Sequence, residues 1–245
     1  MQERRYSLYE QENPAVRDAF SMLSGNIYME SEHRSIRSIV ITSSEPETGK
    51  TSIAVSLAAT MANWGKKTIL IDADMRKRTE MQIPKWGSNQ GLSQYLNETA
   101  EYEEVLCYTN IDGLMYIPNG SFMPNPMGLI CSPRFRQLME RLKEEFEYII
   151  IDSPALDTVS DAVIMSSRAD GALLVARMGK SRLEDLNRSK ERLEAGEAVL
   201  LGVVINKVNK SNYKKYLKAY KYFYTSKREK QKSPKQSKNK NTVVA

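Results

Sequence analysis

The sequence predicts an α/β fold with a doubly wound, mostly parallel sheet, and two observations support this prediction. The first is that strand-like apolar runs alternate with helical patterns along the chain, which is the arrangement of successive βαβ units. The second is the segment at residues 43–52, which reads Ser-Ser-Glu-Pro-Glu-Thr-Gly-Lys-Thr-Ser and lies between the apolar run 39–41 and a helical pattern. A strand, a tight turn and Gly-Lys-Thr opening a helix are typical of a phosphate-binding P-loop. The predicted fold is therefore P-loop NTPase-like.

The predicted elements follow from the apolar patterns and from their start and stop signals. Strands are expected at residues 38–42, 68–72, 114–118, 147–152, 171–176 and 199–205, and helices near 50–63, 132–146, 159–168 and 182–195. Ser132 as N-cap and Pro133 at the first helical position predict a helix start. Gly65 predicts a helix stop before the strand at 68. The proline-rich stretch 118–126 is expected to be a loop on the strand-end face, near the nucleotide.

Length and charge predict one large domain followed by a tail. We expect a nucleotide-binding domain over residues 1–210, a tyrosine cluster over 211–224 and a disordered basic tail over 225–245. The net charge is +6, and the seven basic residues against one acidic residue in the tail account for the whole excess. The body is therefore neutral, and no nucleic-acid partner is expected for the folded domain.

Membrane and redox signals are few in this chain. No run reaches the roughly 20 apolar residues of a membrane span, and the first residues lead into no apolar signal region, so we expect a cytoplasmic protein unless a partner recruits it. Cys107 and Cys131 show neither metal-binding spacing nor a disulfide framework. The single histidine, His33, argues against a histidine-based triad.

The P-loop predicts a set of nucleotide-binding residues. These are Glu47, Thr48, Gly49, Lys50, Thr51 and Ser52. In such a loop the backbone N–H groups surround the phosphates, Lys50 reaches the β- and γ-phosphates, and the Thr51 hydroxyl binds Mg²⁺. The full motif begins with a glycine five residues before the Gly of Gly-Lys-Thr, whereas this chain has Ser44 there.

Two further apolar runs each end in a carboxylate, at Asp72 and at Asp152. Ligands of a doubly wound sheet bind at the carboxyl ends of its strands, so both side chains should converge on the P-loop. Mg²⁺ prefers oxygen ligands and needs only one or two carboxylates beside the phosphates. The alternative is that each aspartate merely ends a strand and caps the next helix. Three strand-end signals in one chain favour an ATP and Mg²⁺ site with Thr51, Asp72 and Asp152 as metal ligands.

A tyrosine cluster follows the last predicted strand, interleaved with lysines. Its members are Tyr213, Tyr216, Tyr220, Tyr222 and Tyr224. Four of them are spaced by three, four and four residues, which is also the pattern of one face of an amphipathic helix. Aromatic and basic residues in alternation are also found in proteins that bind single-stranded nucleic acid. Taken alone, the cluster favours the helix face over any special chemistry.

Together with the P-loop and the two strand-end carboxylates, the cluster makes the chain resemble the bacterial tyrosine kinase family. These are P-loop kinases of capsule and exopolysaccharide operons, and the resemblance runs from about residue 14 to residue 224. Residues 72–77, Asp-Ala-Asp-Met-Arg-Lys, match the family's second motif, and residues 149–154, Ile-Ile-Ile-Asp-Ser-Pro, match its third. The resemblance implies an ATP-dependent protein-tyrosine kinase that autophosphorylates its tyrosine cluster in trans and regulates capsular or extracellular polysaccharide biosynthesis.

The resemblance also implies catalytic roles for Lys50, Asp72, Asp74 and Asp152. Lys50 would hold the phosphates, Asp152 would hold Mg²⁺ together with the P-loop threonine, and Asp72 would orient or deprotonate the incoming tyrosine hydroxyl. Asp74 would support Asp72 or the metal shell.

Three more residues are expected to lie near the site. Asn206 resembles a strand-end asparagine that contacts adenine in related ATPases. For Arg76 and Lys77 one interpretation is that they stabilise developing charge in the reaction, and the favoured interpretation is a solvated basic turn.

Partners are likewise implied by the resemblance. The family works beside a membrane-spanning activator of polysaccharide assembly, whose cytoplasmic tail completes the nucleotide site and recruits the kinase to the inner face of the cell membrane. A protein tyrosine phosphatase and self-association are expected too. The family segment Glu-x-x-Arg-x-x-Arg-x-Asn, linked to ring assembly, appears at residues 18–26 without its two arginines. Ring formation therefore remains open.

Two alternatives from other classes use the same sheet. A partitioning or positioning ATPase would act as a dimerisation switch, but its signature lysine early in the P-loop is absent at Ser44 and Glu45. An iron–sulfur scaffold would use the thiolates of Cys107 and Cys131 to bridge a cluster between subunits. The chain has no Cys-x-x-Cys pair for that purpose.

Overall fold

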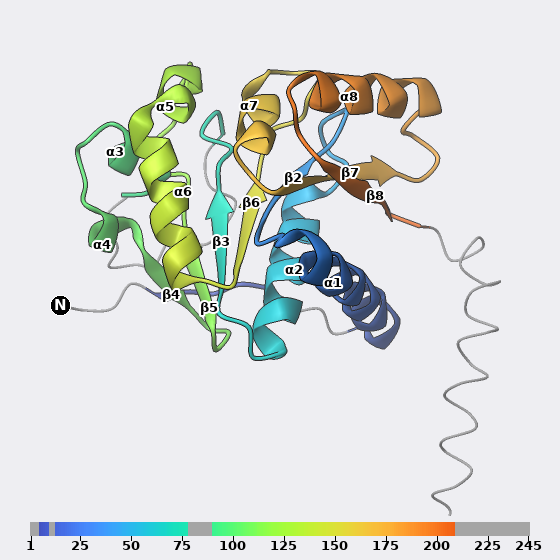
Figure 1. Cartoon of the computed structure of the whole chain (residues 1–245), viewed down its shortest axis with the longest axis horizontal. Coiled ribbons are helices and arrows are strands. Elements are labelled where there is room, and N and C mark those ends of the chain that lie inside the picture. The colour runs from blue at the N-terminus through green and yellow to red at the C-terminus, as the bar shows by residue number, and fades with distance from the viewer. Residues whose placement is uncertain (1–4, 10–12, 78–89, 209–245) are drawn as a thin grey trace, which may run out of the picture. The chain divides into compact units, whose positions relative to one another are not determined.

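A central β-sheet organises the fold, which we describe from a computed structural model covering residues 5–9, 13–77 and 90–208. Within these residues the sheet has eight strands in the order β1-β4-β5-β3-β6-β2-β7-β8, and only the β4–β5 pair is antiparallel (Figure 1). The strands are β1 (Arg5–Tyr6), β2 (Ser38–Thr42), β3 (Thr68–Asp72), β4 (Cys107–Thr109), β5 (Leu114–Ile117), β6 (Tyr148–Asp152), β7 (Gly171–Arg177) and β8 (Leu200–Asn206). The predicted α/β class with a mostly parallel sheet is confirmed.

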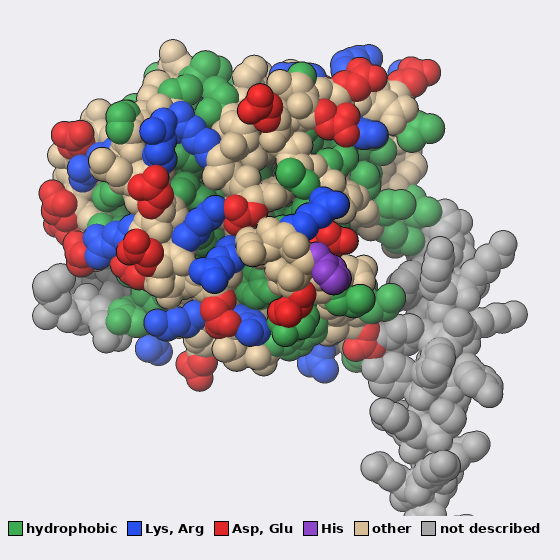
Figure 2. Space-filling model, viewed as in Figure 1, with side chains coloured by type: hydrophobic (Ala, Val, Ile, Leu, Met, Phe, Trp, Pro, Cys, Tyr) green, Lys and Arg blue, Asp and Glu red, His purple; other side chains and the backbone are tan. Residues whose placement is uncertain are grey.

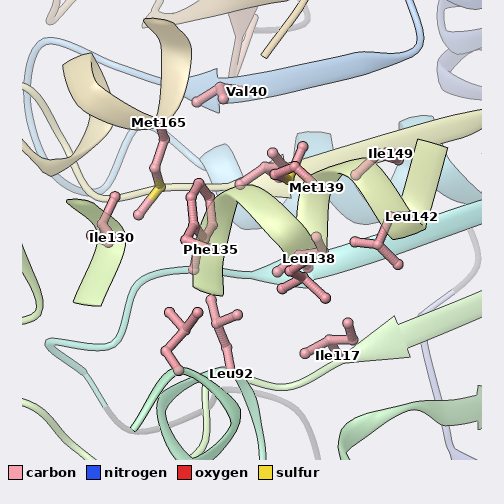
Figure 3. Packing of buried hydrophobic residues seen from close by; sticks show 14 of the residues in the cluster. Val40, Leu92, Ile117, Ile130, Phe135, Leu138, Met139, Leu142, Ile149 and Met165 are labelled. Atoms are coloured by element: carbon pink, nitrogen blue, oxygen red, sulfur yellow. The ribbon is translucent and has the colours of Figure 1, made fainter. Parts of the chain in front are cut away.

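Helices cover both faces of this sheet. They are α1 (Pro14–Arg34), α2 (Lys50–Asn63), α3 (Leu92–Leu96), α4 (Tyr102–Val105), α5 (Met127–Cys131), α6 (Pro133–Glu145), α7 (Asp161–Ser167) and α8 (Leu183–Ala195). α1 and α2 lie on one face, and α5 to α8 lie on the other (Figure 1). Each face has its own hydrophobic core, and Figure 3 shows the second core, where Phe135 and Leu138 of α6 pack over Ile117 and Ile149. Burial of this kind is the main stabilising term of the fold.

The predicted ends of two helices are confirmed in the structure. The Ser132 hydroxyl accepts a hydrogen bond from Phe135 N at 3.3 Å and Pro133 is the first residue of α6. α2 ends at Asn63, and Gly65 follows with φ of +79°, a conformation that glycine adopts without steric cost.

Several elements were not predicted, and α1 is the longest of them. Its only buried residues are Phe20, Ser24 and Ile27. These positions form one narrow stripe spaced by four and three residues, and a serine interrupts it. The apolar pattern of α1 is therefore too weak to predict a helix from the sequence.

Three predictions concern residues outside the described part of the chain. They are the domain boundary at residue 210, the tyrosine cluster at 211–224 and the tail at 225–245. The described part up to Lys207 forms one compact unit. Basic and acidic side chains are interspersed over the face shown in Figure 2. Across residues 5–9, 13–77 and 90–208, none of the helices has the length and apolar character needed to cross a bilayer.

Candidate active site

The P-loop connects β2 to α2, and the end of β8 holds it in place. Gly49 has φ of +94°, and a Cβ there would collide with the side-chain nitrogen of Asn206. That nitrogen donates a hydrogen bond to the Thr48 carbonyl at 2.8 Å, and Lys207 Nζ donates to the Glu47 carbonyl at 2.9 Å. Asn206, predicted to contact adenine, is thus placed against the P-loop backbone.

Ser44, which replaces the first glycine of the P-loop motif, and Glu47, which has a backbone conformation that favours glycine, are accommodated differently. The Ser44 hydroxyl accepts a hydrogen bond from the Ser189 hydroxyl at 2.8 Å and donates to the Asp185 carbonyl at 3.2 Å, so it is occupied by α8. Glu47 is exposed and has φ of +59°, in the left-handed region that favours glycine. The loop therefore keeps a glycine-like backbone at Glu47 and stores strain there.

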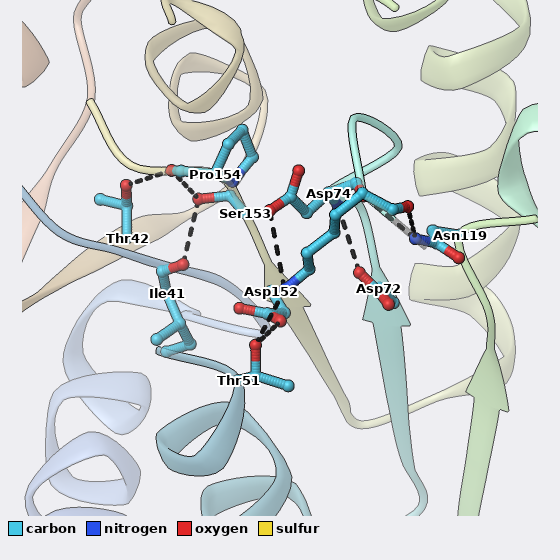
Figure 4. Close-up of polar contacts among 10 residues, drawn as sticks. Ile41, Thr42, Thr51, Asp72, Asp74, Asn119, Asp152, Ser153 and Pro154 are labelled. Atoms are coloured by element: carbon cyan, nitrogen blue, oxygen red, sulfur yellow. Dashed lines mark hydrogen bonds and ion pairs between the residues drawn. The ribbon is translucent and has the colours of Figure 1, made fainter. Parts of the chain in front are cut away.

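The strand-end carboxylates meet beside the P-loop. Asp72 of β3 and Asp152 of β6 are direct cross-strand partners, and each is only 2% exposed. The Thr51 hydroxyl donates a hydrogen bond to Asp152 Oδ2 at 2.6 Å, and Asp74 N donates to Asp72 Oδ1 at 3.2 Å. Figure 4 shows these four residues grouped at the ends of the two strands.

Burial makes this carboxylate pair hard to ionise twice. Burial, followed by the charge of Asp152, raises the pKa of Asp72 well above its usual range. Burial also raises the pKa of Asp152 to about 6, while Lys77, the hydrogen bond from Thr51 and Lys50 oppose the rise. Positive charge from nearby lysines therefore favours the ionised forms of these two carboxylates.

The donor set at this edge fits Mg²⁺ and phosphate oxygens. Among the described residues, the buried atoms Asp152 Oδ1 and Thr48 Oγ1 have no hydrogen-bond partner. Buried polar groups are normally satisfied, so such atoms indicate a place for a ligand. The described part of the chain contains no cluster of three or more His, Cys, Asp or Glu side chains arranged for a metal. Mg²⁺ needs no such cluster, because it keeps waters and takes phosphate oxygens.

The segment after Asp72 corrects the interpretation of Arg76 and Lys77 as a solvated basic turn. Arg76 Nε lies 2.8 Å from Asp161 Oδ2, and Asp161 is only 1% exposed. Lys77 Nζ donates to the Thr51 hydroxyl at 3.3 Å and lies 3.6 Å from Asp74 Oδ2. The interpretation was wrong because the buried partner of Arg76 is 85 residues away in sequence.

Asn119 is a site residue that the sequence did not reveal. Its side chain is fully buried, and its Nδ2 donates to the carbonyl oxygens of Asp74 and Lys77 at 3.0 and 2.8 Å. The loop at 118–126 also contacts the same segment through Met123 N, which donates to Met75 O at 2.8 Å. The loop does lie on the strand-end side, as predicted. The Pro-Asn-Gly run at 118–120 was the available signal, since buried asparagine often holds turn backbone.

The remaining predicted residues are distributed as follows. Lys50 opens α2 and is buried, whereas Ser52 in the same turn is exposed. The five tyrosines lie outside the described residues. Cys107 is fully buried in β4, and Cys131 is exposed on α5. A thiol inside the core cannot bridge a cluster between subunits, which argues against the iron–sulfur alternative.

Comparison with known proteins gives the family. Residues 36–187 match the family model described as an AAA domain. The chain is 36% identical over 193 residues to the tyrosine-protein kinase CpsD of Streptococcus agalactiae, which covers 78% of this chain and 83% of that protein. The chain belongs to the bacterial tyrosine kinase family.

Solved structures agree with this assignment. The chimerical protein CapA2B2 is similar with a TM-score of 0.75 and 33% identity, covering 84% of this chain and 94% of that one. The kinase domain of the Escherichia coli tyrosine kinase ETK is similar with a TM-score of 0.75 and 30% identity, covering 81% of this chain and 79% of that one. Kinase relatives, rather than partitioning ATPases, thus define the family of this chain.

Proposed function

We propose that this chain is an ATP- and Mg²⁺-dependent kinase that phosphorylates its own tyrosine cluster in trans and thereby regulates capsular or extracellular polysaccharide biosynthesis. The observation that carries the proposal is the hydrogen bond from the Thr51 hydroxyl to Asp152, beside Asp72, at the edge of the sheet where the P-loop lies. A P-loop hydroxyl paired with a strand-end carboxylate offers the oxygen ligands that a Mg²⁺–nucleotide complex requires.

In this proposal the residues divide the work by position. Lys50 and the P-loop N–H groups bind the phosphates, and Thr51 and Asp152 hold the metal ion. When bound, Mg²⁺ neutralises charge on the phosphate oxygens. Asp72 accepts the proton of the tyrosine hydroxyl while the tyrosine oxygen bonds to the γ-phosphorus. The bond from that phosphorus to the β–γ bridging oxygen breaks at the same time and releases ADP.

The acceptor in this proposal is the tyrosine cluster of a second copy. Between Lys207 and Tyr224 the sequence has six lysines and no acidic residue, a local charge of +6. Five phosphates would add about −7.5 to −10 charges and invert the sign of the segment. If the unmodified segment binds the acidic edge of a neighbouring site, phosphorylation releases it and favours monomers.

Membership of the family supports a proposal for partners and location. We propose that a membrane-spanning activator recruits the kinase to the inner face of the cell membrane and that its cytoplasmic tail stimulates phosphorylation, with a protein tyrosine phosphatase reversing it. The similar CapA2B2 structure, whose name joins a CapA part to a CapB part, supports a partner of this kind. The charged and strained Glu47 in the P-loop gives this chain a reason to need stimulation.

A mixing experiment tests transfer between copies. One variant carries Lys50→Met and keeps its tyrosines, and the other keeps Lys50 but has all five cluster tyrosines changed to phenylalanine. Neither alone should gain phosphate on the cluster after incubation with ATP and MgCl₂, whereas the mixture should show phosphotyrosine on the Lys50→Met chain. Absence of phosphate in the mixture, with or without the activator tail, contradicts the proposal.

A further inference from the structure

Lys77 has a position that the proposed reaction does not explain. Its ammonium donates to the Thr51 hydroxyl at 3.3 Å and lies 3.6 Å from Asp74 Oδ2. The same hydroxyl donates its only proton to Asp152 Oδ2 at 2.6 Å. The ammonium is therefore bound to the oxygen that a P-loop presents to Mg²⁺.

The Thr51 hydroxyl oxygen can bind only one cation at a time in this position. With its proton committed to Asp152, Thr51 Oγ1 has lone pairs left, and Lys77 uses one of them. Mg²⁺ would need the same oxygen at about 2.0–2.1 Å. A divalent ion and an ammonium so close together, beside buried groups, repel each other strongly.

The charges around the site give Lys77 a function before the metal arrives. Asp72 and Asp152 are buried cross-strand neighbours, and Asp74 lies at the opening of the same site with a side chain 16% exposed. Lys77 is 30% exposed, so its head reaches this group of carboxylates from the solvent side. Its charge acts on both buried carboxylates in favour of their ionised forms.

Two hydrogen bonds hold the backbone at Lys77, whereas no covalent restraint prevents its side chain from rotating. The Lys77 carbonyl accepts a hydrogen bond from Asn119 Nδ2 at 2.8 Å, and the Lys77 N–H donates to the Asp74 carbonyl at 3.3 Å. The preceding residue, Arg76, is paired with buried Asp161. A flexible four-carbon stem on an anchored backbone can rotate without moving the loop.

We propose that Lys77 is a built-in substitute for Mg²⁺: its ammonium balances the site in the nucleotide-free chain and is displaced when Mg²⁺ and nucleotide bind. The two cations compete, so Lys77 sets the Mg²⁺ concentration that the site requires. This inference rests on the proposed Mg²⁺ site and adds a positioning residue to it.

The test measures binding rather than activity. A fluorescent N-methylanthraniloyl derivative of ADP, which cannot donate a γ-phosphate, is held at fixed concentration with the full chain while MgCl₂ is varied. Lys77→Met keeps most of the stem and removes the charge, and Lys77→Gln is a second variant in case the first does not fold. The control is Lys66→Met. Lys66 is similarly exposed, at 33%, and it also forms an ion pair, with Glu147. Lys66 lies just before the start of β3, at the opposite end of that strand from the site.

We expect the half-saturating Mg²⁺ concentration to fall about tenfold in the Lys77 variants, the order expected for removing one unit charge near a partly exposed site, and to stay unchanged in Lys66→Met. Mn²⁺ alone, followed by electron paramagnetic resonance, should bind the nucleotide-free Lys77 variants more tightly as well. An unchanged or higher half-saturating Mg²⁺ concentration in both Lys77 variants overturns the inference. If nucleotide binding by the unaltered chain does not depend on Mg²⁺ at all, the proposed Mg²⁺ site is wrong too, which separates the two failures.

Discussion

Glu47 offers the sharpest single-residue prediction, because the strain at this position can be removed without touching a side-chain contact. Its φ of +59° lies in the left-handed region, where a residue with a Cβ is disfavoured by about 1–2 kcal/mol. Glycine removes that cost but makes the unfolded chain more flexible, which offsets about 0.5–1 kcal/mol. The hydrogen bond from Lys207 uses the Glu47 backbone carbonyl and so survives the change. We expect Glu47→Gly to raise the free energy of unfolding by roughly 0.5–1 kcal/mol.

The matched control is Glu197→Gly. Glu197 is also an exposed glutamate, with φ of +60°, and it follows α8 rather than lying in the P-loop. Urea unfolding should therefore show a similar gain in stability for both variants. Nucleotide affinity should differ, because only Glu47→Gly removes a negative charge beside the phosphates. We expect tighter ATP binding for Glu47→Gly alone.

Two results would refute this reasoning. If neither variant gains stability, the left-handed backbone at these glutamates carries no strain. If Glu197→Gly is stabilised and Glu47→Gly is not, the P-loop strain is compensated locally by contacts beyond the backbone carbonyl. Equal ATP affinity in Glu47→Gly and the unaltered chain would show that the glutamate charge does not oppose phosphate binding.

Three further changes test how the site is held. Because burial raises the pKa of Asp152 to about 6, the charged form of Asp152 opposes folding. Asp152→Asn should therefore abolish phosphorylation yet be more stable than the unaltered chain at pH 7 in EDTA. Urea unfolding at each pH should show this gain in stability vanish as the pH falls from about 6 to about 4. Arg76→Met should lower the free energy of unfolding by about 2–3 kcal/mol, since it strands the buried Asp161 carboxylate, and adding Asp161→Asn should recover part of that loss in the same assay. Asn119→Ala should cost about 2 kcal/mol, because it removes the donor to two carbonyls of the segment at 73–77, and an unchanged midpoint would contradict its role.

Much of the fold could be predicted because its central strands are short, apolar and bounded by clear signals. β2, β3 and β6 are buried at every position, and two of them end in the aspartates that stood out in the sequence. The edge elements could not be predicted in this way. β1 has two residues and β4 has three, so neither strand is long enough to show a periodic pattern of its own. Within the described residues the two strands pair with each other at the edge of the sheet.

The candidate site was predictable where function lies in consecutive residues. Gly49, Lys50 and Thr51 form a motif, and the cross-strand meeting of Asp72 and Asp152 follows from parallel strands that end at one edge. The contacts of Lys77 and Asn119 were not predictable, because each depends on a partner brought close by the fold rather than by the sequence. The tertiary structure decides whether a lysine after a strand faces water or the active site.

The measurement that tests the central claim most directly is the intact mass of the purified chain after incubation with ATP and MgCl₂, with the activator's cytoplasmic tail present and absent. Because Lys50 supplies charge to the phosphates, the unaltered chain should gain up to five phosphates on its tyrosines, and more of them with the tail, whereas Lys50→Met should gain none and change little in stability. Phosphotyrosine in purified Lys50→Met, free of other kinases, or no mass gain in the unaltered chain under either condition, would contradict the account.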